Sequence, residues 1–278
     1  MLLSLDSSVS ALDQFQQGLD VIGNNIANVN TVGFKSSTSN FEDTFSQTVG
    51  SNSTGPMQVG TGVATSSITT DFTEGSITGT GVPTDMAIDD QSGGSSSFFL
   101  VKDPSTGAEY ATRDGEFSVD NSGYLTTSSG MRVQGYTDAG LTTMGDVQIN
   151  NTGAPNGDTS PVASYTFSSN GTVSVQLDDG TDFTRGQILL QSFTEPSQLT
   201  KVGDNLYTGL TAAGPLATPS VAGTNGLGTI VTGSLEMSNV DLAGQMTDLI
   251  TVQRAYEANT KVVTTSDEIL QDLINMKR

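Results

Sequence analysis

The chain has 278 residues, enough for one or two domains with a buried core. Its 30 acidic and 10 basic residues give a net charge of −20, which argues against nucleic acid and anionic membrane surfaces as partners. Cys and His are absent, which excludes disulfides, a thiol nucleophile, an ordinary zinc site and a Ser–His relay. We therefore expect no cofactor and no metal.

The first 27 residues predict a long helix, from about residue 3. Apolar side chains recur every seven residues, with a companion position three residues further on, which is the spacing of a coiled-coil seam. Such a stripe is too narrow to be wrapped by a core, so the helix needs a partner of its own length. Asn28, Asn30 and Gly33 end the helical pattern. The expected interface positions are Leu5, Leu12, Phe15, Leu19, Ile22 and Ile26.

Residues 36–70 follow the first segment, 1–35, and are rich in Ser, Thr, Gly and Asn. This composition predicts an extended or weakly ordered connector. Within this connector, residues 46–56 are small and polar, and Val49 is their only apolar side chain. Ordering such a segment costs on the order of 1 kcal/mol per residue with little apolar burial in return. We expect it to be compliant.

Residues 71–192 show short strands with turns every 8–12 residues and predict an all-β body, an antiparallel sandwich or barrel. The clearest hairpin alternates Val173, Val175 and Leu177 toward the core and turns at Asp179-Gly180. Residues 193–237 return to Gly, Ser, Thr and Ala and predict a descending connector.

Residues 238–278 predict a second long helix, for which Ser238 or Asn239 with Asp241 resembles a capping box. The fold class is therefore mixed and mainly β, with terminal helices forming a coiled-coil pair around an inserted β-domain. The first and last forty residues each carry a net charge of −2, so the acidic middle suits a solvated outer surface. The expected interface positions are Leu242, Met246, Leu249, Val252, Tyr256, Val263, Leu270 and Leu273.

Two carboxylate groups could in principle support other functions. Asp89-Asp90 and Asp178-Asp179 are dense enough for glycoside hydrolysis, and residues 120–123 and 178–182 are similar to calcium loops. However, Asp in a hairpin turn is favoured for backbone reasons, and neither loop continues into the full calcium-binding pattern. A surface β-protein that binds or cleaves polysaccharide is thus a remote alternative.

The stretches LDVIGNNIANVNTVGFKSS (19–37), GSLEMSNVDL (233–242) and residues 252–278 resemble the terminal signatures of bacterial flagellar rod and hook proteins. Residues 70–88, 110–125 and 186–207 resemble the middle β-domain of the same family. VGFKSS, DFTEG and LEMSNVDL are most similar to the hook subunit, in a short form without the large outer domain. The matching signature positions are Asn24, Asn25, Ala27, Asn28, Gly33 and Phe34.

The resemblance implies a structural role and no enzymatic activity. Subunits would assemble helically into the hook, the flexible coupling that transmits torque from rod to filament; the alternative is the distal rod, the drive shaft. The implied partners are further copies, the distal rod, hook-cap and hook–filament junction proteins, and the flagellar type III export apparatus. We expect export without a cleaved signal peptide and an extracellular location in the hook or basal body. We expect no membrane insertion, because no stretch of the chain approaches 18 apolar residues.

Overall fold

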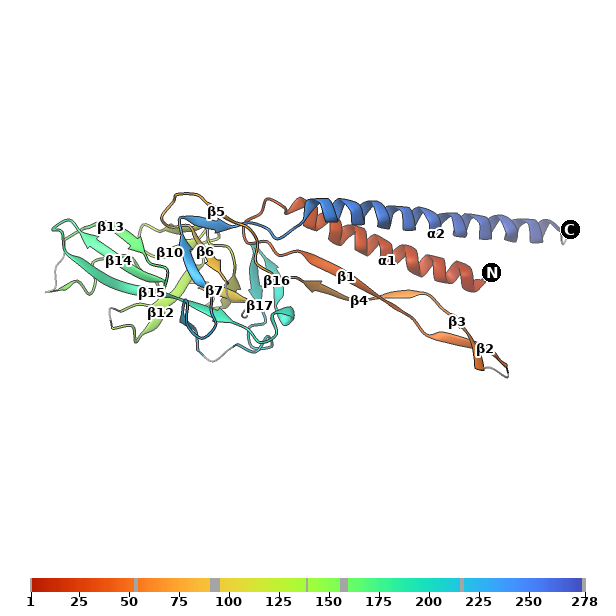
Figure 1. Cartoon of the computed structure of the whole chain (residues 1–278), viewed down its shortest axis with the longest axis horizontal. Coiled ribbons are helices and arrows are strands. Elements are labelled where there is room, and N and C mark those ends of the chain that lie inside the picture. Colours follow the sequence, from red (N-terminus) through yellow and green to blue (C-terminus); the bar gives the residue numbers. More distant parts are fainter. Residues whose placement is uncertain are drawn as a thin grey trace. The chain divides into compact units, whose positions relative to one another are not determined.

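The computed structural model describes residues 2–52, 55–90, 96–138, 140–155, 160–215 and 218–276 (Figure 1). The chain folds as two compact units. Unit 1 comprises Met1–Val29, Ser36–Asp71 and Val240–Arg278, and unit 2 comprises Asn30–Lys35 and Phe72–Asn239. The backbone therefore passes from one unit to the other four times, and the short loop 30–35 belongs to unit 2 although both of its neighbours in sequence belong to unit 1.

Unit 1 is built on two long helices, α1 (Leu2–Ala27) and α2 (Leu242–Met276). They pack antiparallel along each other, with both chain termini at the same end of the pair (Figure 1). This confirms the predicted helical pair. The residue that caps α2 is Asp241, whose Oδ1 accepts a hydrogen bond from the Ala243 N–H at 3.1 Å. Asn239, one of the expected caps, instead donates to the Thr73 carbonyl at 3.2 Å.

The segment 36–70 forms an ordered ribbon. β1 (Ser37–Asp43) pairs antiparallel with β4 (Val63–Thr70), and β2 (Ser46–Asn52) pairs with β3 (Gly55–Gly60). Ser and Thr hydroxyls across β1 and β4 contact one another, as Ser37 and Thr70 do at 3.4 Å, and the Phe41 ring meets Phe15 of α1 edge-on at 6.1 Å. The segment is thus extended as expected, and its strands are paired with one register shift in each pair. Helix α1 packs against β1 and β4.

Unit 2 is an antiparallel β-structure, as predicted. Among the described residues, twelve strands form one sheet with a central order β13-β14-β15-β11-β7-β8-β17-β16, while β6 pairs with β19 and β5 with β20. Strands β5 to β12 are Ile77–Gly79, Met86–Asp89, Ser97–Lys102, Glu109–Thr112, Phe117–Val119, Leu125–Thr127, Arg132–Tyr136 and Met144–Asp146. Strands β13 to β20 are Val162–Phe167, Thr172–Leu177, Asp182–Ser192, Thr200–Gly203, Leu206–Thr208, Ser220–Val221, Thr229–Thr232 and Ser234–Glu236.

The predicted hairpin is β14–β15. Val173, Val175 and Leu177 are each buried in the main core of unit 2, and the turn closes with the Gly180 N–H donating to the Leu177 carbonyl at 3.0 Å. A second core is aromatic, with the Phe98 ring within 6.0 Å of three other rings. Because residues of the segment 193–237 contribute to this aromatic core, the segment is not the descending connector that the sequence predicts.

Residues 193–237 contribute strands β16 to β20 and the short 3-10 helix η2 (Pro196–Gln198). Several of their large apolar side chains are deeply buried, Phe193 and Tyr207 in the aromatic core and Ile230 in the main core, whereas Val202 is exposed. The segment is therefore part of the β-body of unit 2. None of the described helices is long and apolar enough to cross a membrane.

Candidate assembly interface

The helix pair brings most of the predicted seam positions together within unit 1. Ile22 is buried, and the remaining positions on α1 and four on α2 are partly buried. Ser8 and Ser266 are also buried, and small side chains at these points let the two helices approach closely. The partly buried positions are Leu5, Leu12, Phe15, Leu19 and Ile26 on α1, and Leu249, Val252, Val263 and Leu270 on α2.

Another part of the α2 surface is apolar and exposed. Four predicted interface positions, Leu242, Met246, Tyr256 and Leu273, lie between 37% and 47% exposed. The sequence reasoning missed further exposed apolar residues on the same helix, because it considered only the heptad positions. They are Ile250, Val262, Ile269, Ile274 and Met276. These exposed apolar side chains are available to contact another protein chain.

Several threonine hydroxyls of α2 are hydrogen-bonded to backbone carbonyls of the same helix. Thr247, Thr251 and Thr260 each donate a hydroxyl hydrogen bond to the carbonyl four residues earlier, at 2.9 Å. These hydroxyls make no demand on a neighbouring chain, so α2 can present methyl groups between its apolar side chains. The polar flanks are thus compatible with close packing against further helices.

Asn25 is the buried polar centre of unit 1. Its Nδ2 donates to the Ser37 carbonyl at 2.8 Å and to Gln245 Oε1 at 2.9 Å, and its Oδ1 accepts from the Ser37 N–H at 3.0 Å. One side chain therefore joins α1, α2 and the start of β1. Asn24 and Ala27 are exposed, and Asn28 donates to the Asn24 carbonyl and Oδ1, which closes the last turn of α1.

Gly33 and Phe34 are packed inside unit 2. Gly33 has φ +65°, and a Cβ at this position would lie 2.7 Å from the Asp114 backbone nitrogen. Phe34 is buried with Lys201 Nζ 4.5 Å from its ring centroid. Four signature positions, Asn25, Asn28, Gly33 and Phe34, therefore have intrachain roles in this structure, whereas Asn24 and Ala27 are exposed.

A buried ionic cluster was missed by the sequence reasoning. Lys35 Nζ lies 2.5 Å from Glu236 Oε1, and Arg113 Nη1 lies 3.2 Å from Glu236 Oε2; all three side chains are 0% exposed. Arg113 also pairs with Asp90. Burial lowers the pKa of Lys35, and the facing Glu236 carboxylate opposes that shift. Lys35 and Glu236 both lie in the quoted signatures, but nothing in one sequence pairs residues this far apart.

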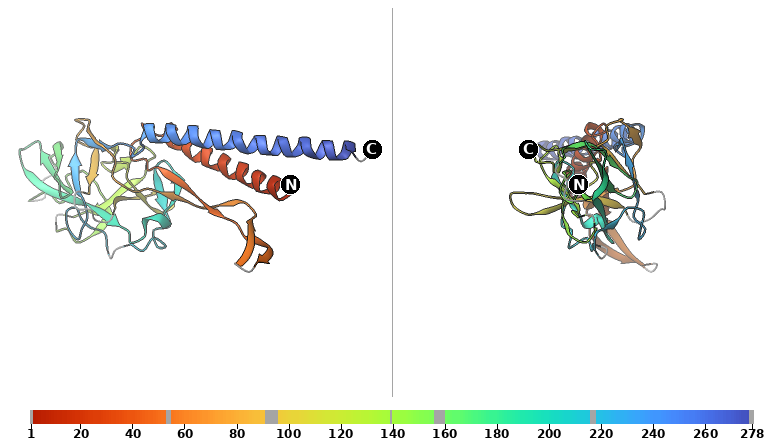
Figure 2. Two further views of the ribbon diagram at one scale, coloured as in Figure 1. Left: turned by 45° about the vertical axis from the view of Figure 1, so that its right-hand side comes forward. Right: turned by 90° about the vertical axis from the view of Figure 1, so that its left-hand side faces the viewer.

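The β2–β3 end of the ribbon carries a second exposed apolar surface. Phe45 is 93% exposed, and Val49, Met57 and Val59 are also exposed. Figures 1 and 2 show this end of the ribbon standing away from both helices of unit 1. Sequence reasoning on residues 46–56 found only Val49, because Met57 and Val59 lie just beyond that window.

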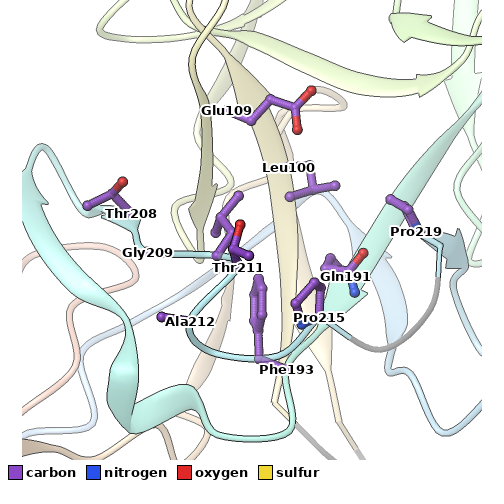
Figure 3. A pocket seen from close by; sticks show the side chains of 11 residues that line it. Leu100, Glu109, Gln191, Phe193, Thr208, Gly209, Thr211, Ala212, Pro215 and Pro219 are labelled. Atoms are coloured by element: carbon purple, nitrogen blue, oxygen red, sulfur yellow. The ribbon is translucent and has the colours of Figure 1, made fainter.

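Unit 2 has a cavity of about 620 Å³ on one side (Figure 3). Apolar side chains from β7 and β15 and from the loops after β17 line it, including Leu100, Phe193 and Pro215. Among the described residues that line it, Glu109 is the only acidic one, and a pair of carboxylates of the kind that hydrolases use is not found among them.

Both carboxylate groups named above as possible hydrolase or calcium sites make structural contacts within the chain. Asp179 accepts from the Thr181 N–H and hydroxyl at 2.9 and 2.8 Å, which is turn chemistry, and Asp90 pairs with Arg113. Within the described part of the chain, no group of three or more acidic residues converges as a metal site would require.

Comparison with known proteins agrees with this architecture. Three family models match: "Flagella basal body rod protein" at residues 5–35, "Flagellar hook protein FlgE/F/G D1 domain" at 94–175, and "Flagellar basal body rod FlgEFG protein C-terminal" at 231–276. The chain is 38% identical to the flagellar basal-body rod protein FlgG of Bacillus subtilis (strain 168) and 33% identical to that of Borreliella burgdorferi, covering 100% of each chain.

A more distant relative is the flagellar hook protein FlgE of Escherichia coli (strain K12). It is 26% identical over an alignment of 418 residues, which covers 99% of this chain and 100% of that protein. Paired terminal helices, an inserted antiparallel β-body and full-length similarity to these relatives lead to one conclusion: the chain belongs to the flagellar basal-body rod and hook family and is an axial structural protein of the bacterial flagellum.

Proposed function

We propose that the chain is a subunit of the flagellar rod, and specifically of the distal rod, rather than of the hook. The observation that carries this proposal is the β2–β3 hairpin, whose strands pair antiparallel with one register shift between Thr48 and Gly50 and which exposes Phe45, Val49, Met57 and Val59. Full-length relatives named as basal-body rod proteins support it, since they are more similar to this chain than the hook protein is.

The hook expectation rested on a compliant connector at residues 46–56. Instead, the pairing of β2 with β3 within one chain already offsets much of the conformational entropy that is lost when this segment is ordered. Burying its exposed apolar side chains against a neighbouring copy would stabilise that contact by about 25 cal/mol per Å² of apolar area. Such a contact resists sliding between neighbours, which suits a straight drive shaft and opposes the flexibility of a hook.

The exposed apolar face of α2 supplies the second proposed contact. Leu242, Met246, Tyr256 and Leu273 would pack against helices of further copies and form the inner layer of a helical tube. The acidic unit 2 would form its outer layer. Further partners in this proposal are the hook protein that continues the axis, other rod proteins, and the type III apparatus that exports the subunits.

Deletion of the gene followed by imaging of isolated basal bodies tests the proposal. We expect axial structures that end within the rod and carry no hook, restored by the wild-type gene supplied in trans. A complete rod that lacks only the curved external hook would overturn the assignment and make the chain a hook subunit.

A further inference from the structure

The Glu236 carboxylate lies at the centre of the buried ionic cluster of unit 2. Its Oε1 accepts from Lys35 Nζ at 2.5 Å and from the Gly75 N–H at 2.9 Å, and its Oε2 accepts from Arg113 at 3.2 Å. The Glu236 backbone carbonyl also accepts from the Gly33 N–H at 2.8 Å. One residue thus bonds to three separate segments of the chain.

Two of these segments, the one with Gly33 and Lys35 and the one with Gly75, lie beside points where the chain leaves unit 2, whereas Arg113 lies well inside unit 2. The backbone passes between the units at 29–30, 35–36, 71–72 and 239–240. Gly33 and Lys35 lie between the first two crossings, and Gly75 follows the third. Glu236 itself precedes the fourth by a few residues. Every covalent connection from unit 2 to unit 1 is therefore fixed close to its origin by this one glutamate.

Neighbouring bonds tighten the same segments. Lys35 Nζ also donates to the Thr73 carbonyl at 2.6 Å, and the Asn239 amide donates to that same carbonyl at 3.2 Å. On the other side of the loop, Asn205 Nδ2 donates to the Val32 carbonyl at 2.6 Å and Lys201 Nζ to the Lys35 carbonyl at 2.8 Å.

We infer that Glu236, Lys35 and Arg113 form an electrostatic clamp, which gathers all four connections of unit 2 at one buried point. A solvated surface pair could not do this, because its interaction is weak and screened by salt. With 0% exposure of all three side chains, removal of one partner leaves an uncompensated buried charge, so the clamp opens as a unit. The inference holds for a hook subunit as well as for a rod subunit.

Hydrogen exchange on the full-length chain tests the clamp. In E236Q we expect the amides of residues 30–35, 73–76 and 237–239 to exchange at least tenfold faster, while amides of β14 and β15 stay within twofold of wild type. The matched control is D146N, which removes the partly exposed Arg132–Asp146 pair at 2.9 Å elsewhere in unit 2. It should leave the three connecting segments unchanged.

The double variant K35M/E236Q separates a clamp from a general contribution to the core. It removes the Lys35 and Glu236 charges together and leaves Arg113 paired with Asp90, so unit 2 should unfold at the wild-type denaturant concentration, yet the three connecting segments should remain fast in exchange. Unchanged protection of these segments in E236Q and in the double variant overturns the inference. Equal loss of protection across all of unit 2 in both variants also overturns it, because the cluster would then belong to the core alone.

Discussion

Gly33 occupies a position that backbone conformation and neighbouring atoms both reserve for glycine. Its φ of +65° is left-handed, and an added Cβ would lie 2.7 Å from the Asp114 nitrogen and 2.8 Å from the Arg113 carbonyl carbon. The loop 30–35 can therefore reach Glu236 only because this residue has no side chain. A glycine in the signature is explained here by packing inside unit 2.

Replacing Gly33 by Ala should destabilise unit 2 more than replacing Gly130 by Ala. Both glycines have positive φ, but a Cβ at Gly130 would meet no atom within 4 Å. G130A should lower the free energy of unfolding by about 1–2 kcal/mol from backbone strain alone, and G33A should lower it further because backbone atoms must move. Urea unfolding followed by circular dichroism measures both. Equal losses would mean that the neighbours of Gly33 yield easily.

The low pKa values of Asp103 and Asp138 should make the folded state less stable in strong acid. Hydroxyl and amide donors of Ser105 and Thr106, and of Thr142 and Thr143, hold the pKa of each carboxyl at about 2, below the ordinary 3.8. The folded state thus binds fewer protons, and this stabilisation is complete above pH 3.8 and is lost as the pH falls toward 2. The free energy of unfolding of D138N should therefore fall less steeply over this range than that of wild type. Identical slopes in denaturant titrations at several pH values would contradict the assignment.

The two helices of unit 1 are specified by their heptads, and the sequence predicted them with nearly the observed ends. β14 was predictable for a similar reason, because its alternation places Val173, Val175 and Leu177 in one core. The ribbon β1–β4 was not predictable in detail. Its Ser- and Thr-rich strands carry no apolar alternation, and their pairing, such as Ser37 with Thr70, depends on register across 33 residues.

The same limit applies to the buried cluster. Lys35 and Glu236 are separated by 201 residues, and a Lys beside a Phe or a Glu beside a Met looks like an ordinary surface charge in one sequence. Only the fold of unit 2 shows that both are buried. Likewise, residues 193–237 have the composition of a connector, yet several of their large side chains complete both cores.

Asn25→Ala should loosen the joint between α1, α2 and β1. The change leaves the buried Ser37 N–H and the Gln245 amide without this partner, which costs about 1–3 kcal/mol. The matched control is Gln16→Ala, which removes an exposed amide side chain from the same helix. Hydrogen exchange of the α1 and α2 amides should accelerate in N25A only. Comparable exchange in the two variants would show that Asn25 does not hold the joint.

Leu249→Asp should prevent assembly while leaving unit 2 folded. Leu249 is partly buried in the helix pair, and an unpaired carboxylate there costs several kcal/mol per subunit. Gln253→Asp, at an exposed position of the same helix, is the control and should assemble. Leu19→Asp on α1 should behave as Leu249→Asp does. Electron microscopy at high protein concentration scores the tubes, and normal tubes from L249D would show that the helices are not an assembly contact.

At the scale of the whole molecule, two exposed apolar surfaces are available for the contacts between copies that an axial structural protein needs. The helix pair exposes Leu242, Met246 and Tyr256, and the ribbon exposes Phe45 and its neighbours on β2–β3. Both surfaces lie in unit 1, which has a net charge of −8, against −12 for the longer unit 2. The first and last forty residues, which contain the two helices, each carry only −2 and so oppose close packing of further copies weakly.

In the proposed function, contacts of the β2–β3 hairpin separate a rigid rod from a flexible hook, so the surroundings of this hairpin in the polymer are the central point to measure. Cryo-electron microscopy of the polymer formed by the purified wild-type chain tests it most directly. We predict a straight tube with the helix pairs innermost and the side chains of Phe45, Val49, Met57 and Val59 buried against neighbouring copies. A curved tube in which this hairpin faces solvent and contacts no neighbour would contradict the account.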